Sequence, residues 1–222
     1  MRMDGSIVQF NEIVTLLGAG PVENRVFSES LALGPIIIAA DGGAEKALEF
    51  GHIPQMVFGD LDSISDAARA RIGPERLHQV KEQDTTDFDK TLRSISAPLV
   101  LALGFTGGRL DHELAVYNVL VRTKTLPVIV VGSDDICFHL AGSVDLTLPI
   151  GTRVSLFPMA EVVCKSTGLH WATDHLTFAP WGRVGTSNQS IAETVTLSSD
   201  TPGMLVILPR SELKSAVRAL TG

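Results

Sequence analysis

Short apolar segments alternate with amphipathic segments along the chain up to about residue 133. The apolar runs "IVTLL", "PIIIAA", "MVFG", "LVLALG" and "PVIVVG" are typical of buried strands. Between them, apolar residues recur at helical spacing, as Ala44, Ala47 and Leu48 do before Gly51. Thr86, three residues before Asp89, matches a helix-capping pattern. The alternation predicts an α/β fold, a mostly parallel sheet with helices on both faces.

The pattern changes after about Asp135, where apolar runs shorten and Thr, Ser, Val and Gly accumulate. Segments such as "VDLTLPIG", "RVSLFPM", "EVVCKSTG" and "ETVTLSS" indicate short strands separated by turns. They predict a C-terminal all-β sandwich or barrel. We therefore expect an α/β domain over residues 1–134 and a β domain over residues 135–222, ending in a short amphipathic helix in "RSELKSAVRALTG".

Composition and charge restrict the possible partners. The 222 residues are 45% hydrophobic and 19% charged, as in globular proteins, and the net charge is −7. A negative chain has no broad field to attract nucleic acid or an anionic membrane. No apolar run approaches the roughly 20 residues of a membrane span. Asp4 and Glu12 interrupt the stretch where a signal peptide is apolar, so we expect a cytoplasmic protein. Cys137 and Cys164 lack metal-ligand spacing, and we expect both to be buried.

Aspartates follow four of the predicted strands. Ligands of open parallel sheets bind beyond the carboxyl ends of the strands, where these acids are expected to meet. A single Asp after a strand is usually a helix cap or a turn residue. A cluster of them needs protonation or a cation, and Mg²⁺ is the simplest cation to bridge carboxylates and phosphates. The acids are Asp41, Asp60, Asp62, Asp84, Asp87 and Asp111.

Groups suited to phosphate accompany the acids. The pairs Gly42–Gly43 and Gly107–Gly108 open predicted helices, whose first N–H groups favour anions. Arg109 offers a forked guanidinium and Lys90 a point charge. The "GAG" at residues 18–20 is a weak signal, because Glu23 stands where a dinucleotide fingerprint has glycine.

Seven motifs in order carry a family resemblance. "DGGA", "GDLDS", "QDTTDFDK", "GGRLDH", "VSLFP", "STGLHW" and "GTSN" resemble the thiamine pyrophosphokinases. The resemblance implies a nucleotide-binding catalytic α/β domain and a β-sandwich for thiamine binding and dimerisation. It implies that Mg²⁺ and ATP serve to convert thiamine to thiamine diphosphate and AMP. It also implies a homodimer, with thiamine bound between the α/β domain of one subunit and the β domain of the other.

Carried onto matching positions, the resemblance implies a role for each candidate residue. The ATP site comprises Asp41, Gly42, Gly43, Gly107, Gly108 and Arg109, and the metal ligands are Asp60, Asp62 and Asp84. The catalytic set is Asp84, Asp87, Lys90, Arg109 and Asp111, of which Asp84, Asp87 and Asp111 remain alternatives as the proton acceptor. Trp171, Ser187 and Asn188 face thiamine. Without the resemblance, Trp171 reads first as a core residue and Ser187 and Asn188 as a turn.

Two other functions compete. "VFGDLDSI" is similar to the strand-end Asp-x-Asp of haloacid-dehalogenase-type phosphatases, in which Asp60 would be the nucleophile. Those enzymes usually carry the motif on the first strand, whereas here at least two predicted strands precede it. A non-catalytic nucleotide-binding protein is the second alternative. It gives no reason for the full set of acids together with Lys90 and Arg109.

Overall fold

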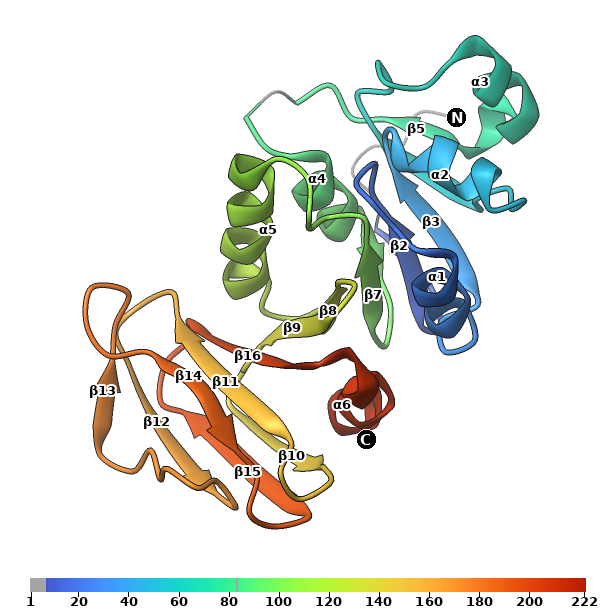
Figure 1. Ribbon diagram of the computed structural model, residues 1–222. Coiled ribbons are helices and arrows are strands. Elements are labelled where there is room, and N and C mark those ends of the chain that lie inside the picture. The colour runs from blue at the N-terminus through green and yellow to red at the C-terminus, as the bar shows by residue number, and fades with distance from the viewer. Residues whose placement is uncertain (1–6, 83) are drawn as a thin grey trace. The chain divides into compact units, whose positions relative to one another are not determined.

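The computed structural model describes residues 7–82 and 84–222 (Figure 1). The described chain divides into two compact units. The first extends to Val119 and includes Val130–Ser133, and the second comprises Leu120–Ile129 and Asp134–Gly222. No helix among the described residues has the length and apolarity needed to cross a membrane.

The first unit is built on a parallel sheet with strand order β7-β2-β3-β4-β5. The strands are β2 (Val14–Leu17), β3 (Ile36–Ala40), β4 (Met56–Gly59), β5 (Leu77–Gln79) and β7 (Val100–Leu103). The helices are α1 (Asn24–Leu31), α2 (Gly43–Glu49), α3 (Asp66–Ile72), α4 (Asp87–Ser94) and α5 (Leu110–Arg122), with a short 3-10 turn at Pro74–Arg76. A separate two-stranded parallel ribbon joins β1 (Val8–Gln9) to β6 (Ile95–Ser96).

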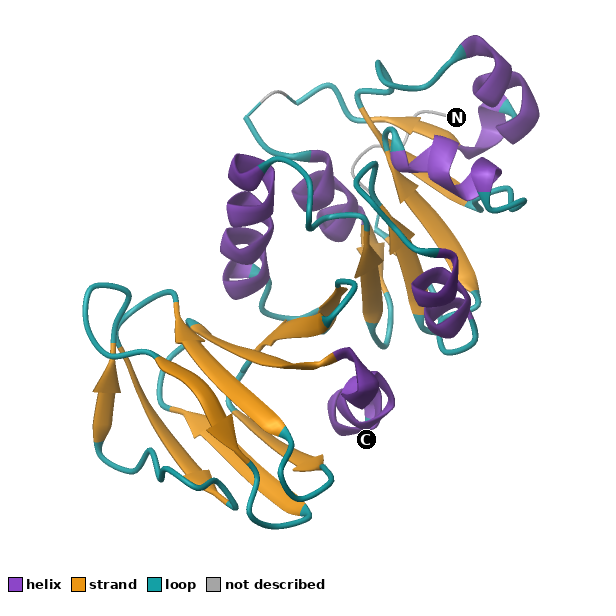
Figure 2. Cartoon of the chain, viewed as in Figure 1, coloured by secondary structure: helices purple, strands orange, loops and turns teal. Residues whose placement is uncertain are grey.

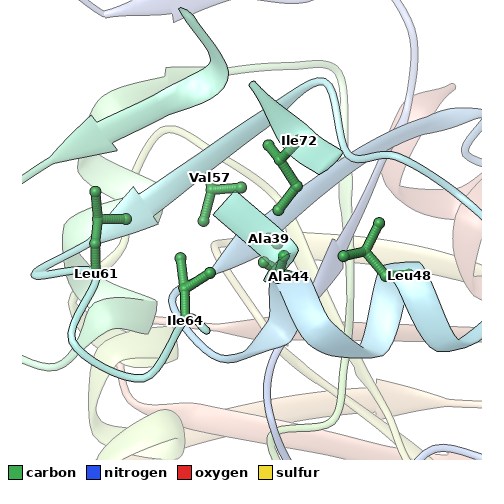
Figure 3. Close-up of a cluster of buried hydrophobic side chains, with 8 residues drawn as sticks. Ala39, Ala44, Leu48, Val57, Leu61, Ile64 and Ile72 are labelled. Carbon is green, nitrogen blue, oxygen red and sulfur yellow. The ribbon is translucent and has the colours of Figure 1, made fainter. Parts of the chain in front are cut away.

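A compact apolar cluster holds α2 and α3 to the sheet (Figure 3). Ala39 of β3 and Val57 of β4 meet Leu48 of α2 and Ile72 of α3, and Leu61 joins them from the loop after β4. Neighbouring strand residues point to opposite faces, so the buried Phe58 faces away from this cluster. The helix α4 packs against β4 and β3, so helices cover both faces of the sheet (Figure 1).

The sequence pattern missed α1. Its residues are mostly polar, and only Val26, Phe27 and Ser30 are buried, so the apolar periodicity is too sparse to indicate a helix. The other helices lie where they were expected. Thr86 caps α4 by accepting a hydrogen bond from the backbone N–H of Asp89 at 3.3 Å, as predicted.

The second unit is mainly antiparallel (Figure 2). Its strands are β9 (Asp135–His139), β10 (Ser143–Thr147), β11 (Arg153–Pro158), β12 (Val162–Thr167), β13 (Leu176–Phe178), β14 (Gly185–Gln189), β15 (Thr194–Ser199) and β16 (Met204–Pro209), and β8 (Val128–Val131) precedes them. They pair in the orders β14-β11-β16-β9 and β10-β15-β12-β13. The expected terminal helix is α6 (Leu213–Thr221), after a short 3-10 turn. Cys137 and Cys164 are buried free thiols, as expected. The predicted fold class, a parallel α/β sheet followed by an antiparallel β region, is confirmed.

Candidate active site

A cleft of about 550 Å³ opens in the first unit beyond the carboxyl ends of β2, β3, β4 and β7. Open α/β sheets bind ligands at this edge, and the volume lies within the range of small-molecule sites, roughly 300–1,000 Å³. The predicted site residues that line the cleft are Asp41, Gly42, Asp60, Asp87, Lys90, Gly108 and Arg109. Segments that are distant in the sequence therefore converge here, because parallel strands bring the loops that follow them to one side.

Three carboxylates meet in the cleft. Asp41 follows β3, Asp60 follows β4, and Asp87 begins α4, and one oxygen of each lies within 4.8 Å of the others. Gly59 gives them room, because a Cβ at this position would lie 2.8 Å from Cβ of Asp41 and 3.2 Å from Oδ1 of Asp87. The φ angle of Gly59 is 150°, which side-chain-bearing residues rarely adopt. The end of β4 is thus shaped for this close approach.

Asp41 is the most constrained of the three acids. Its side chain is buried, and among the described residues its Oδ1 atom has no hydrogen-bond partner. Burial raises the pKa of Asp41, and the nearby charges of Asp87, Asp60 and Asp62 raise it further, against a lowering effect of Ser63. A divalent cation bound here would offset the repulsion among the carboxylates and would give the unpaired Oδ1 atom of Asp41 a ligand. An all-carboxylate oxygen set of this kind fits Mg²⁺.

A buried cation lies beside the acids. Lys90 is only 4% exposed, and its Nζ lies 3.0 Å from Oδ1 of Asp87 on the same helix. Burial of a lysine is tolerated when its charge is paired. The arrangement leaves a positive group facing a small cleft, which suits it to bind phosphate.

The glycine loop after β2 forms another wall of the cleft. A Cβ on Gly18 or Gly20 would lie 2.6 or 2.7 Å from the carbonyl oxygen of Gly104, so the loops after β2 and β7 pack backbone to backbone. Gly18 and Gly20 line the cleft although the sequence marked "GAG" as a weak signal. Glycine is required at these positions because the two loops pack closely, and a dinucleotide-binding motif does not describe that contact. Other lining residues that were missed are Ser63, Thr85, Thr86, Phe105, Thr106, His112 and Val116.

The remaining predicted residues of the first unit are not among the described residues that line the cleft. Asp62 and Asp84 are exposed, and the backbone N–H of Asp62 donates to Oδ1 of Asp60 at 3.4 Å. Asp111 is exposed and bound by Arg109, with Nη2 to Oδ2 at 2.6 Å, and this hydrogen bond lowers the pKa of Asp111. Gly43 packs tightly against the carbonyl of Leu17. Within the described part of the chain, the lining of the cleft does not include Gly43, Asp62, Asp84, Gly107 or Asp111.

The expected thiamine-facing residues lie in the second unit. Trp171 is 60% exposed and so lies outside the core. Asn188 is buried and holds the backbone of Trp171, accepting from its N–H at 3.1 Å and donating to its carbonyl at 2.8 Å. Ser187 has a left-handed φ of 62°, and its N–H donates to Oγ of Ser155 at 3.0 Å. Asn188 therefore fixes the place of Trp171 while the indole remains accessible.

Comparison with known proteins identifies the family. The model "Thiamin pyrophosphokinase, catalytic domain" matches residues 27–130, and "Thiamin pyrophosphokinase, vitamin B1 binding domain" matches residues 143–204. Thiamine pyrophosphokinase 2 of Arabidopsis thaliana is 31% identical over 73% of this chain and 74% of its own. The chain belongs to the thiamine pyrophosphokinase family. Thiamine pyrophosphokinase 1 of Oryza sativa subsp. japonica, 28% identical over 73% of this chain and 75% of its own, is a further relative.

Solved thiamine pyrophosphokinase structures share this fold. The enzyme of Candida albicans superposes with a TM-score of 0.76 at 16% identity, covering 94% of this chain and 98% of its own. The enzyme of Bacillus subtilis superposes with a TM-score of 0.71 at 22% identity, covering 89% of this chain and 98% of its own. The fold is retained at low identity, and the family resemblance drawn from the seven motifs is confirmed.

Proposed function

We propose that this thiamine pyrophosphokinase family member transfers the diphosphoryl group of ATP to the hydroxyl of thiamine, giving thiamine diphosphate and AMP. One observation carries the proposal for the site. Asp41, Asp60 and Asp87 converge beside Lys90 and Arg109 in a single cleft. The chain that builds this cleft also matches both the catalytic and the vitamin B1 binding models of the family.

Mg²⁺ is part of the proposal because the acids fit it. Asp41, Asp60 and Asp87 are the residues that would hold the ion, and the exposed Asp62 and Asp84 stay candidates from the family resemblance. When bound, Mg²⁺ neutralises phosphate charge and orients the polyphosphate. The loops after β3 and β4 and the start of α4 determine where these three carboxylates lie.

The side chains of the cleft supply positioning and charge stabilisation, which phosphoryl transfer chiefly needs. The thiamine hydroxyl oxygen bonds to the β-phosphorus of ATP, the bond from that phosphorus to the oxygen bridging to the α-phosphate breaks, and AMP leaves with the electron pair. We propose that Lys90 and Arg109 stabilise the negative charge that develops on the leaving oxygen. Of the three candidate proton acceptors, Asp87 lines the cleft, whereas Asp84 and Asp111 are not among its lining residues in the described part of the chain. This placement favours Asp87.

Thiamine binding and assembly complete the proposal. The exposed indole of Trp171, held through Asn188, offers a flat face for a cationic aromatic substrate. Following the family resemblance, we propose a homodimer in which this face of one subunit meets the cleft of its partner. We propose a cytoplasmic location, where ATP is supplied. The phosphatase alternative is disfavoured, because Asp60 follows β4 rather than the first strand of the sheet.

An assay of AMP and thiamine diphosphate formation tests the function. We expect both products only when ATP, Mg²⁺ and thiamine are present together. Asp60→Asn should lower kcat by about 10²–10³-fold, because it removes a charge that organises the phosphates. The matched control is Asp66→Asn, an exposed acid on α3, which should retain normal turnover.

Other outcomes would support the competing functions. Release of inorganic phosphate without thiamine would indicate a phosphatase. Binding of ATP and thiamine without turnover would indicate a non-catalytic protein. Near-normal activity of folded Asp60→Asn would remove Asp60 from the metal site.

A further inference from the structure

The loop Asp60–Ile64 carries Asp60, one of the three clustered carboxylates, and contains a residue in an unfavourable backbone conformation. Leu61 has a φ of 68°, in the left-handed region that its side chain disfavours. Its side chain is buried in the apolar cluster of Figure 3, while Asp60 lines the cleft and Asp62 is exposed. A conformation of this kind persists only when the surrounding structure holds it.

Two side chains from outside the cleft hold this loop by its carbonyl groups. Arg69 of α3 donates from Nε to the carbonyl of Ile64 at 3.1 Å and from Nη2 to the carbonyl of Leu61. Gln79, the last residue of β5, donates from Nε2 to the carbonyl of Asp60 at 3.0 Å. The loop backbone is therefore tied to both neighbouring elements, α3 and β5.

Arg69 is suited to this task by its geometry. A guanidinium presents several donors in a rigid plane, so one side chain satisfies two carbonyls and fixes the distance between them. Arg69 is itself only partly exposed and does not belong to the lining of the cleft among the described residues. It therefore acts on the site only through the backbone that carries Asp60 and Asp62.

We propose that Arg69 is a positioning residue of the metal site, which holds the Asp60–Ile64 loop in the conformation that directs Asp60 to the cation. The inference rests on the proposed function, since it presumes that Asp60 binds a divalent ion. Removal of a group that orients a metal ligand without binding the metal itself commonly weakens metal affinity by about 10- to 100-fold. The contacts of Arg69 place it in that role here.

Metal affinity measured without turnover tests the proposal. Mn²⁺ binding is followed by electron paramagnetic resonance with α,β-methylene-ATP present, because that analogue cannot be cleaved at the reacting bond. Arg69→Met keeps the length of the side chain and removes its donors, and we expect about 10-fold or greater weakening. Arg69→Lys, which keeps the charge but not the fork, should weaken binding less. Arg71→Met, an exposed arginine on the same helix, is the matched control and should bind within twofold of wild type.

Kinetics separate positioning from simple stabilisation. In Arg69→Met we expect a higher Mg²⁺ requirement, partial recovery of kcat at high Mg²⁺, and an unchanged thiamine KM. A lower melting temperature with wild-type Mn²⁺ affinity in the folded fraction would overturn the proposal. If Arg69→Met does not fold, Arg69→Lys and Gln79→Leu take its place, and unchanged affinity in both would overturn it equally. Absence of Mn²⁺ binding in the wild-type protein would overturn both this inference and the proposed metal site.

Discussion

The role expected of each aspartate depends on the residues that surround it. Asp41, Asp60 and Asp87 share one small volume, whereas Asp62 and Asp84 are exposed and Asp111 is paired with Arg109. All six follow predicted strands, so sequence position alone does not separate them. The separation depends on loop conformation, as at Leu61, and on the glycine that lets Asp41 and Asp87 approach.

Asp41→Asn should stabilise the metal-free protein at neutral pH. Because burial and nearby acids raise the pKa of Asp41, the native state binds a proton more readily than the unfolded chain. The free energy of unfolding therefore falls as the pH rises from the ordinary pKa of Asp, about 3.9, through the raised pKa of Asp41 in the native state. The uncharged Asn escapes this loss. We expect a higher melting temperature at pH 7, where each kcal/mol corresponds to about 2–4 °C, and a difference that shrinks on acidification.

Adding MgCl₂ should reverse the order of the two proteins. The wild-type melting temperature should rise because bound cation opposes the repulsion, while Asp41→Asn should respond weakly. Differential scanning calorimetry at several pH values measures both effects, with Asp66→Asn as a control. A variant that is less stable than wild type at pH 7 without metal would contradict this account.

At the scale of elements, the sequence predicted the ends of helices but not the close packing between distant loops. The Thr86 cap of α4 and the glycine stop after α2 follow from residues near each helix end. The helix α1 was missed because few of its residues are apolar. The contact between the loops after β2 and β7 joins segments far apart in the chain, so no local pattern indicated it.

Loss of the α4 cap should lower both stability and catalytic activity. Thr86→Ala leaves the N–H of Asp89 without its side-chain acceptor and should lower the free energy of unfolding by about 1 kcal/mol. Because Asp87 and Lys90 lie in the first turns of α4, kcat should fall as well. Urea unfolding and steady-state kinetics measure the two effects. Thr86→Ser, which retains the hydroxyl, should restore both, and failure of this rescue would argue against the cap.

At the scale of the whole molecule, the proposed reaction divides its residues between two units. The acids and Lys90 belong to the first unit, and Trp171 and Asn188 belong to the second. The two family models match the chain in the same succession. In the proposed dimer, a cleft from one subunit therefore works with a thiamine-facing surface from the other.

Mixing two defective variants tests this shared site. Asp60→Asn should be inactive, and Trp171→Ala should raise the thiamine KM by about 5- to 30-fold with little change for ATP, as expected for loss of a cation–π contact. After denaturation and joint refolding, a mixed dimer has one site with both defects and one with neither. At a thiamine concentration near the wild-type KM, activity should therefore exceed the sum of the separate proteins. Trp181→Ala, also highly exposed, is the control for Trp171. No recovery, or a monomer by light scattering, would contradict the shared site.

The sequence by itself determined the fold class, most helices and strands, the family and the pool of acidic candidates. These depend on periodicity, capping residues and ordered motifs, which are local properties of the chain. Only the tertiary structure decided which of the predicted acids meet, namely Asp41, Asp60 and Asp87. It also showed that Gly18 and Gly20 line the cleft and that Arg69 binds the carbonyl groups of Leu61 and Ile64. Such contacts arise between residues brought together by strand order and loop geometry, and their distances are set by packing rather than by spacing along the chain.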